Sequence, residues 1–409
     1  MGRDVNRSDR KSERWKTMTL VALGQKKMFQ NPIPALLHLF VYVGFVLINI
    51  EVLEMFIDGT AGTHRVLSFL NIGDFHLYNY MIGSFEVLAF LVTLGCALFL
   101  VRRNIIHVKR LAMKELNGWP RTDANLILIS EILIMSALFL MNTADQSLQI
   151  IGSEHYHTVG SFPVTKHLTS FFSGMDEHSL IMIEKTSWWF HIVGVFGFLN
   201  YLVISKHLHI LLAFPNVFYS NLNPKGQFTN LESVTNEVKA MLDTSFSPPP
   251  PDPNHPQRFG AKDVFDLSWK QLLDSYSCTE CGRCTAVCPA NQTGKLLSPR
   301  KIMMDTRDRL EEVGKNIDKN KKFADDNKSL SGNYISAEEL WACTTCNACV
   351  QACPVNIDPL SIIVDLRRFL VMEQSAAPQS LNMISTNIEN NGAPWQYSPA
   401  DRLNWAKEN

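Results

Sequence analysis

The sequence lacks the features that identify several common classes of protein. Its 38 Lys and Arg nearly balance its 39 Asp and Glu, which excludes both a strongly basic nucleic-acid binder and an acidic disordered tail. Nine cysteines among 409 residues are too few for a disulfide scaffold. A G-x-G-x-x-G after a strand and pairs of adjacent cysteines are also missing. We therefore expect no nucleic-acid partner and no nucleotide site of that type.

Charged residues are scarce in four long windows of the first half. The windows are residues 32–50, 79–101, 124–144 and 186–205. Two of them carry no Asp, Glu, Lys or Arg, and the other two carry only Glu86 and Glu131. About 20 such residues are needed for a helix to cross the hydrocarbon core of a bilayer. Four windows so close together predict four transmembrane helices rather than buried helices of a soluble protein.

The positions of Lys and Arg predict the orientation of these helices. Eight of them precede residue 32, and six lie between the second and third windows. The other two connections are poor in basic residues, with Arg65 in the first and Lys166 and Lys185 in the last. Because cytoplasmic connections carry the excess of Lys and Arg, both termini are predicted to be cytoplasmic. The expected location is the inner membrane, crossed several times.

A proline-rich stretch separates the apolar half from the rest. Residues 247–257 contain six prolines in eleven positions, which is typical of a stiff linker. The predicted divisions are a cytoplasmic segment 1–31, a transmembrane domain 32–219, a connecting segment 220–259, a cysteine-bearing domain 260–375 and a partner-contacting tail 376–409.

Two cysteine runs follow the linker, CTECGRCTAVCP from Cys278 and CTTCNACVQACP from Cys343. Each has the spacing C-x2-C-x2-C-x3-C-P, which binds a [4Fe–4S] cluster, and the fourth cysteine of each run ligates the other cluster. Cluster 1 is therefore predicted to use Cys278, Cys281, Cys284 and Cys353. Cluster 2 is predicted to use Cys343, Cys346, Cys349 and Cys288. Zinc is the alternative, because C-x2-C pairs also hold zinc. The ninth cysteine, Cys96, is expected to be a small apolar residue of a span.

The segments around the runs favour helices. Residues 299–313, within the 54-residue insert between the runs, and residues 359–372 have helix formers and amphipathic spacing. The predicted fold class is therefore all-α, with a four-helix transmembrane cytochrome b-like bundle followed by a mainly helical two-cluster ferredoxin domain.

Three histidines in or beside the apolar windows are candidate haem ligands, since ligand-capable residues inside spans are functional candidates. His38 and His209 are expected at similar depth near the inner face and are predicted to ligate one haem b. The 18 residues from His191 to His209 make five helical turns, so both would face one way, roughly 27 Å apart. His191 thus suits a second haem near the outer face. His207, about 160° out of phase with His191, ranks lower. Interfacial histidines without a ligand role are the alternative.

The two carboxylates inside the windows, Glu86 and Glu131, admit two interpretations. They could serve a proton path or contact a quinone, or they could be paired with groups of a neighbouring helix.

The segment WWFHIVGVFGFLNYLVISKHLHILLAFPNVFY (residues 188–219) resembles the last helix of the nitrate reductase gamma-subunit superfamily, which includes heterodisulfide reductase cytochromes b. His38, followed by Gly44 and Phe45, resembles the first ligand helix of that family. The resemblance implies haem b held by one histidine from each helix, with quinol reacting near the outer haem. The position for the second ligand on the first helix, around Ile48, is not histidine, so the resemblance allows either one or two haems.

Residues 263–372, with CTECGRCTAVCPA, LLSPRKI and WACTTCNACVQACPVNIDPL, resemble the iron–sulfur subunit of heterodisulfide reductases. The tail IENNGAPWQYSPADRLNWA resembles the segment that follows the clusters in that group. The resemblance implies a hetero-oligomer in which a cytoplasmic cysteine-rich iron–sulfur protein or flavoprotein supplies the catalysis.

Together these observations predict a membrane-anchored electron-transfer subunit that links quinone, haem b and two [4Fe–4S] clusters to that partner. No residue of this chain is predicted to be catalytic. One alternative is a membrane anchor without haem that docks an iron–sulfur complex, and another is a redox sensor.

Overall fold

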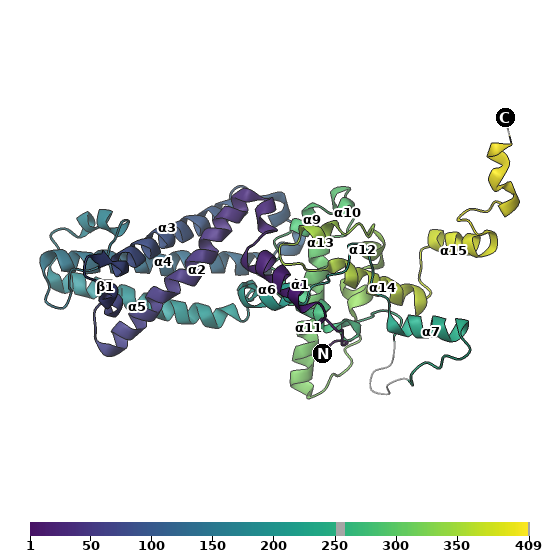
Figure 1. Cartoon of the computed structure of the whole chain (residues 1–409), viewed down its shortest axis with the longest axis horizontal. Coiled ribbons are helices and arrows are strands. Elements are labelled where there is room, and N and C mark those ends of the chain that lie inside the picture. The colour runs from purple at the N-terminus through teal and green to yellow at the C-terminus, as the bar shows by residue number, and fades with distance from the viewer. Residues whose placement is uncertain (251–257, 408–409) are drawn as a thin grey trace.

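The computed structural model describes residues 1–250 and 258–407, and it is built mostly from helices (Figure 1). Within this part of the chain, β1 (Asn71–Ile72) and β2 (Phe75–His76) form one short antiparallel hairpin. The mainly helical character predicted from the sequence is confirmed. Most of the predicted proline linker, residues 251–257, lies outside the described residues.

The helices follow one another along the chain in two groups, one before and one after the proline-rich stretch. The first group is α1 (Lys11–Met18), α2 (Pro32–Ala61), α3 (Leu77–Asn104), α4 (Trp119–Ile151), α5 (Glu177–Leu202), α6 (His209–Phe218) and α7 (Glu232–Leu242). The second group is α8 (Trp269–Ser277), α9 (Arg283–Ala286), α10 (Pro289–Gln292), α11 (Pro299–Asn320), α12 (Ala337–Trp341), α13 (Ala348–Ala352), α14 (Pro359–Met372) and α15 (Gln379–Asn391).

Helices α2, α3 and α4 are long and apolar enough to cross a membrane, and α5 with α6 meets the same test as a bent pair. The described chain thus has three or four candidate spans, and α2–α5 lie along one another in Figure 1. Each helix extends beyond its apolar window at one end or both. In α2 the extension contains Glu51 and Glu54. Both are buried, and the helix continues past them to Ala61.

Glycines end two of these helices, and another glycine allows two of them to pack closely. Gly62 and Gly152 follow α2 and α4 in the left-handed conformation that ends many helices. Gly44 lets α2 approach α3, because a Cβ atom there would overlap Cγ2 of Val92. The two helices consequently depend on a residue without a side chain at their contact.

The fourth apolar window does not form one helix through to His209, so the predicted five-turn spacing from His191 is wrong. Helix α5 ends at Leu202, and the next segment turns by 84° before α6 begins. Ser205 is extended, and its side chain accepts a hydrogen bond from the backbone of His207. Asp123 accepts another from the backbone of Lys206 at 3.1 Å. These side chains satisfy backbone groups that a continuous helix would have used internally.

Helices α8–α14 form a separate unit around one apolar core that includes Cys278, Cys288 and Cys353. The predicted helix 359–372 is confirmed with the same bounds, and the helix predicted at 299–313 continues to Asn320. Ser268 and Ser336 cap α8 and α12 through reciprocal hydrogen bonds with the third helical residue. The core is buttressed by Arg309, which is fully buried and paired with Asp263 and Asp326.

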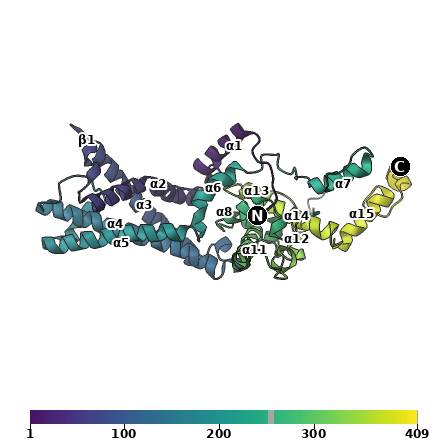
Figure 2. The ribbon, with the colours of Figure 1, turned by 90° about the horizontal axis from the view of Figure 1, so that it is seen from below.

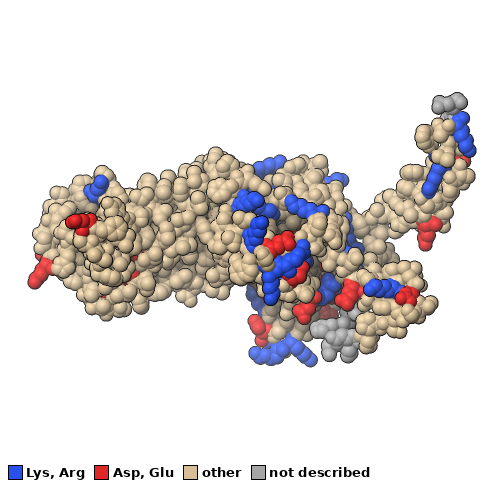
Figure 3. Space-filling model, viewed as in Figure 1, with Lys and Arg blue, Asp and Glu red and all other residues tan. Residues whose placement is uncertain are grey.

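Charged residues are distributed unevenly over the molecule. In Figure 3 the surface of the long helices is almost free of charge, whereas Lys, Arg, Asp and Glu gather over the second unit. The end of the chain, with α15 and residues 399–406, extends away from the body (Figure 2). Its large apolar side chains are exposed, among them Trp395, Tyr397 and Trp405.

Substituting Gly44 by alanine should destabilise the packed helices. The new methyl group would meet Val92, and overpacking costs about 1–3 kcal/mol. We expect a lower midpoint of thermal unfolding in detergent. Gly197→Ala is the matched control, since a Cβ atom there meets no described atom within 4 Å. Equal midpoints for the two variants would contradict the close contact of α2 and α3.

Candidate functional site

The two cysteine runs repeat one backbone conformation. In the first run Glu280 and Gly282 have φ of 57° and 71°, and in the second Thr345 and Asn347 have 55° and 60°. Left-handed conformations are costly for residues other than glycine. Their recurrence at matching positions shows that both loops curl in the same way around their sulfur atoms.

The first predicted ligand set lines one cavity. Cys278, Cys281, Cys284 and Cys353 all border it, so the fourth cysteine of the second run reaches the first run. Burial, and after it the neighbouring sulfur of Cys281, raises the pKa of Cys353 to about 11. Such thiols are protonated at neutral pH, and binding of iron would release their protons. The thiolate-rich donor set suits an iron–sulfur cluster.

The second predicted set is gathered around the other run. Burial raises the pKa of the Cys343 and Cys349 thiols, and the nearby sulfur of Cys288 raises both further. Cys346 is exposed, whereas Cys349 is buried. The backbone N–H of Thr345 donates to Sγ of Cys343 at 3.4 Å, a contact of the kind that tunes cluster potentials. Cys346 is thus the most exposed cysteine of the two sets and the one most accessible to a partner.

Zinc was the alternative for both runs. Among residues 1–250 and 258–407, no three His, Cys, Asp or Glu side chains are arranged to hold a single metal ion. The first set lines a cavity.

The first cysteine set faces the apolar helices. Arg110, between α3 and α4, donates to the backbone oxygen of Cys281 at 2.6 Å. The buried Arg300 donates to the backbone oxygen of Arg110 and pairs with Glu115 at 2.7 Å. A Cβ atom at Gly282 would lie 2.5 Å from the Arg300 guanidinium and 3.0 Å from the backbone oxygen of Arg110, so glycine leaves room for both groups. The domain therefore docks through the cluster 1 loop.

Two ion pairs share Glu280, and one of them also joins the first cysteine run to the apolar helices. Lys206, just after α5, pairs with Glu280 at 2.6 Å, and Glu280 also pairs with Arg307 at 2.8 Å. Burial opposes ionisation of Glu280, but the two cations outweigh it and hold its pKa below the ordinary value. Because Glu280 stands between Cys278 and Cys281, this network fixes the loop of the first set.

Three histidines converge at the ends of the apolar helices that lie toward the cysteine domain. The rings of His38 and His209 are 6.4 Å apart between centroids, and His207 is 5.7 Å from His209. His207, ranked lower by helical phase, belongs to this group because the chain bends at residues 203–205. Gln25 hydrogen-bonds to Nδ1 of His38, and the backbone oxygen of Lys206 to Nδ1 of His209. In both rings Nε2 is the nitrogen left for a metal.

His191 lies apart from this group, buried against α4. Its Nδ1 donates to the backbone oxygen of Ile134 at 2.9 Å. Its Nε2 is buried and has no hydrogen-bond partner among the described residues. This pattern is typical of a metal-ligating histidine, in which one nitrogen is oriented by the protein and the other is free.

The sequence analysis missed a buried polar network at the far end of the helices. Arg65 pairs with Glu51 at 3.2 Å and with Asp145 at 2.9 Å, and it donates to Asn142. His64 is 2.9 Å from Asp145. The signal was present, since Arg65 is the one basic residue of its connection and Glu51 directly follows the first window. The pairing of Arg65 was not predicted, because its charge was considered only in predicting the orientation of the helices.

Glu86 is held by the connection between α4 and α5. Its carboxylate accepts from the backbone of Val164 at 2.8 Å and from the hydroxyl of Thr165. Of the two interpretations offered for this residue, the structure favours a paired carboxylate. Glu131 is also buried, beside Cys96.

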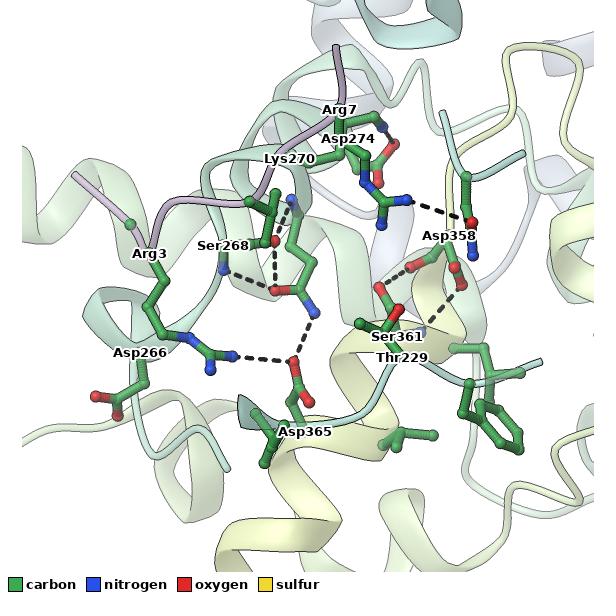
Figure 4. Close-up of a pocket in the computed structure, with 18 of the residues that line it drawn as sticks. Arg3, Arg7, Thr229, Asp266, Ser268, Lys270, Asp274, Asp358, Ser361 and Asp365 are labelled. Carbon is green, nitrogen blue, oxygen red and sulfur yellow. Dashed lines mark hydrogen bonds and ion pairs between the residues drawn. The ribbon is translucent and has the colours of Figure 1, made fainter. Parts of the chain in front are cut away.

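A cavity of about 2080 Å³ lies between the N-terminal segment and the second unit. Figure 4 shows Arg3 reaching Asp365 and Arg7 reaching across the cavity, where it donates to Asn221. Lys270 pairs with Asp274 in its wall at 2.6 Å. The cavity borders the second run at Asn347, Val350 and Gln351, and none of the predicted cysteine ligands is among the residues that line it.

Comparisons with known proteins agree with the cysteine geometry. Residues 277–357 match the family model described as a 4Fe-4S dicluster domain. The match supports two [4Fe–4S] clusters in this part of the chain. No solved structure matches the chain significantly.

The whole chain is similar to iron–sulfur oxidoreductases. It is 28% identical to the probable iron-sulfur-binding oxidoreductase FadF of Bacillus subtilis, over 100% of this chain and 57% of that protein. It is 25% identical to the EtfAB:quinone oxidoreductase of Syntrophomonas wolfei, over 99% and 55% respectively. A subunit of a CoB-CoM heterodisulfide reductase of Methanosarcina acetivorans is 34% identical over 29% of this chain and 60% of its own length. The chain thus spans little more than half of the two long relatives.

Serine substitutions of single cysteines should sort the ligands into two sets. Cys353→Ser should alter the same cluster signal as Cys278→Ser, and Cys288→Ser the same signal as Cys343→Ser, because each run lends one sulfur to the other. Iron per chain should fall from about eight toward about four. Electron paramagnetic resonance of the reduced protein and iron analysis measure both effects. Cys96→Ser is the control and should change neither, and pairing of Cys288 with Cys278 would contradict the assignment.

Proposed function

We propose that this chain is the membrane-anchored electron-transfer subunit of a quinone-linked oxidoreductase. It would pass electrons between membrane quinone, haem b and two [4Fe–4S] clusters, to or from a cytoplasmic catalytic partner. The observation that carries the proposal is the docking of the first cysteine set onto the inner ends of the apolar helices, where His38 and His209 converge.

The proposed cluster ligands follow the two cysteine sets. Cluster 1 would be held by Cys278, Cys281, Cys284 and Cys353, and cluster 2 by Cys343, Cys346, Cys349 and Cys288. Bound there, the clusters would accept and release single electrons. The protein buries cluster 1 against the membrane domain and leaves cluster 2 open at Cys346. This order supports electron transfer between the membrane and a partner at the far side, in either direction.

The inner histidine pair fits one haem b. Two imidazole rings separated by a gap, each with one nitrogen free, would be able to hold a haem iron between them. The rings of His38 and His209 are separated by 6.4 Å. Both have Nδ1 engaged by the protein, which orients Nε2 and fixes the tautomer. We therefore propose that these two residues ligate the haem.

His191 is proposed as a ligand of a second haem toward the outer face. Its free Nε2 supports this role. The opposite position on α2, around Ile48, offers no histidine. One haem is thus the minimum of the proposal and two the maximum.

The membrane location rests on three or four apolar helices and on charge. The basic side chains Arg110 and Lys27 contact the cysteine domain directly, so the basic connections and the domain lie on one side. We propose that this side is cytoplasmic, that both termini share it, and that the membrane is the inner one. The quinone would enter from the lipid phase.

The catalytic partner would be a separate cysteine-rich iron–sulfur protein or flavoprotein, giving a hetero-oligomer. The relatives FadF and EtfAB:quinone oxidoreductase carry additional length that this chain does not span. The exposed tail from residue 376, with Trp395 and Trp405, is the proposed contact.

An anchor without haem is the second candidate, and the absorbance spectrum separates the two. The purified protein should show a b-type haem spectrum, which His38→Ala and His209→Ala should abolish because each removes an axial ligand. His178→Ala, at an exposed position in the first turn of α5, is the control. A parent protein without haem, or variants that keep its spectrum, would leave the anchor as the function.

A further inference from the structure

Lys206 touches both proposed redox sites. Its backbone oxygen lies 3.0 Å from Nδ1 of His209, and its Nζ lies 2.6 Å from Glu280. Because a carbonyl oxygen can only accept, Nδ1 of His209 carries the hydrogen. Lys206 thus orients a proposed haem ligand with its backbone and holds the cluster 1 loop with its side chain.

A second connection of the same kind starts at His38. Gln25 hydrogen-bonds to Nδ1 of His38 at 3.2 Å. Two residues further on, Lys27 donates to the backbone oxygens of Cys353 at 3.1 Å and Val350 at 3.2 Å. Each histidine of the pair is therefore linked through one short segment to the loops that carry cluster 1.

We infer that Lys206 and Lys27 are positioning residues for electron transfer between the inner haem and cluster 1. The inference rests on the proposed function. One electron passes between the two cofactors, so that one is oxidised as the other is reduced, while no bond breaks and no proton moves. Rates of such steps depend on geometry held by the surrounding shell. Lys206 would hold this geometry on the side of His209, and Lys27 would hold it on the side of His38.

The network tolerates removal of the Lys206 side chain. Glu280 would keep its ion pair with Arg307, and Asp123 would keep hydrogen bonds from Tyr201 and from the backbone of Lys206. The backbone oxygen that orients His209 remains. Lys206→Met should therefore fold and bind its cofactors, because Arg110 still holds the loop, while the loop loses the ion pair between Lys206 and Glu280.

The test compares Lys206→Met and Lys27→Met in the full-length protein with its cofactors. The control is Lys26→Met, because Lys26 is exposed and adjacent to Lys27. After rapid reduction of the haem by a quinol analogue, freeze-quenched samples report the rate at which cluster 1 becomes reduced. We expect this rate to fall about tenfold in both variants, since small displacements of reacting groups have effects of this size or larger. Lys26→Met should match the parent.

Two further measurements separate positioning from a structural role. Haem spectrum, iron content and direct reduction of the clusters by dithionite should stay at parental values, and Lys206→Arg should restore most of the rate. The midpoint potential of cluster 1 should become more negative in Lys206→Met, because a nearby positive charge favours the reduced cluster.

Unchanged transfer rates in both lysine variants, or loss of iron from them, would overturn the inference. Either result leaves the proposed function standing if the parent contains haem and two clusters. Absence of haem from the parent is the separate result that removes the proposed function itself.

Discussion

The way the cysteine-bearing domain packs on the apolar helices depends on hydrogen bonds to backbone carbonyl groups of the two cysteine runs. A buried carbonyl group without a hydrogen bond is costly, and charged donors make the strongest bonds to it. Arg110 supplies such a donor to Cys281, and Lys27 supplies one to Cys353. Asn216 of α6 adds a neutral donor to Val355 at 2.9 Å. Basic side chains beside the apolar helices, which predicted the orientation of these helices, are thus also side chains that dock the cysteine-bearing domain.

Much of the local structure could be predicted from the sequence, because spacing and hydropathy act over short distances. The helix at 359–372 has the predicted bounds, and the four apolar windows all fall within long helices or the bent pair. The grouping of cysteines around two sites followed from their spacing. These features depend on neighbouring residues and on the chemistry of thiolate ligands rather than on distant partners.

The features that could not be predicted depend on contacts between distant segments. The break after Leu202 is stabilised by Asp123, which lies in another helix. Glu51 ended an apolar window, yet it remains inside α2 because Arg65 returns from the following connection to neutralise it. A prediction made from each apolar window alone takes neither Asp123 nor Arg65 into account. The convergence of His38 with His209 was predicted, but the bend after Leu202, which also brings His207 to them, was not.

The two cysteine runs have identical spacing and the same left-handed positions, but they are not interchangeable. At the fifth position of its run, Gly282 leaves room for Arg300 and for the backbone oxygen of Arg110, whereas Asn347 occupies the matching place in the second run. A side chain at Gly282 would crowd both groups, and Arg110 belongs to the connection between α3 and α4. One missing Cβ atom thereby distinguishes two otherwise equivalent loops, and it lets only the glycine-bearing loop lie this close to that connection.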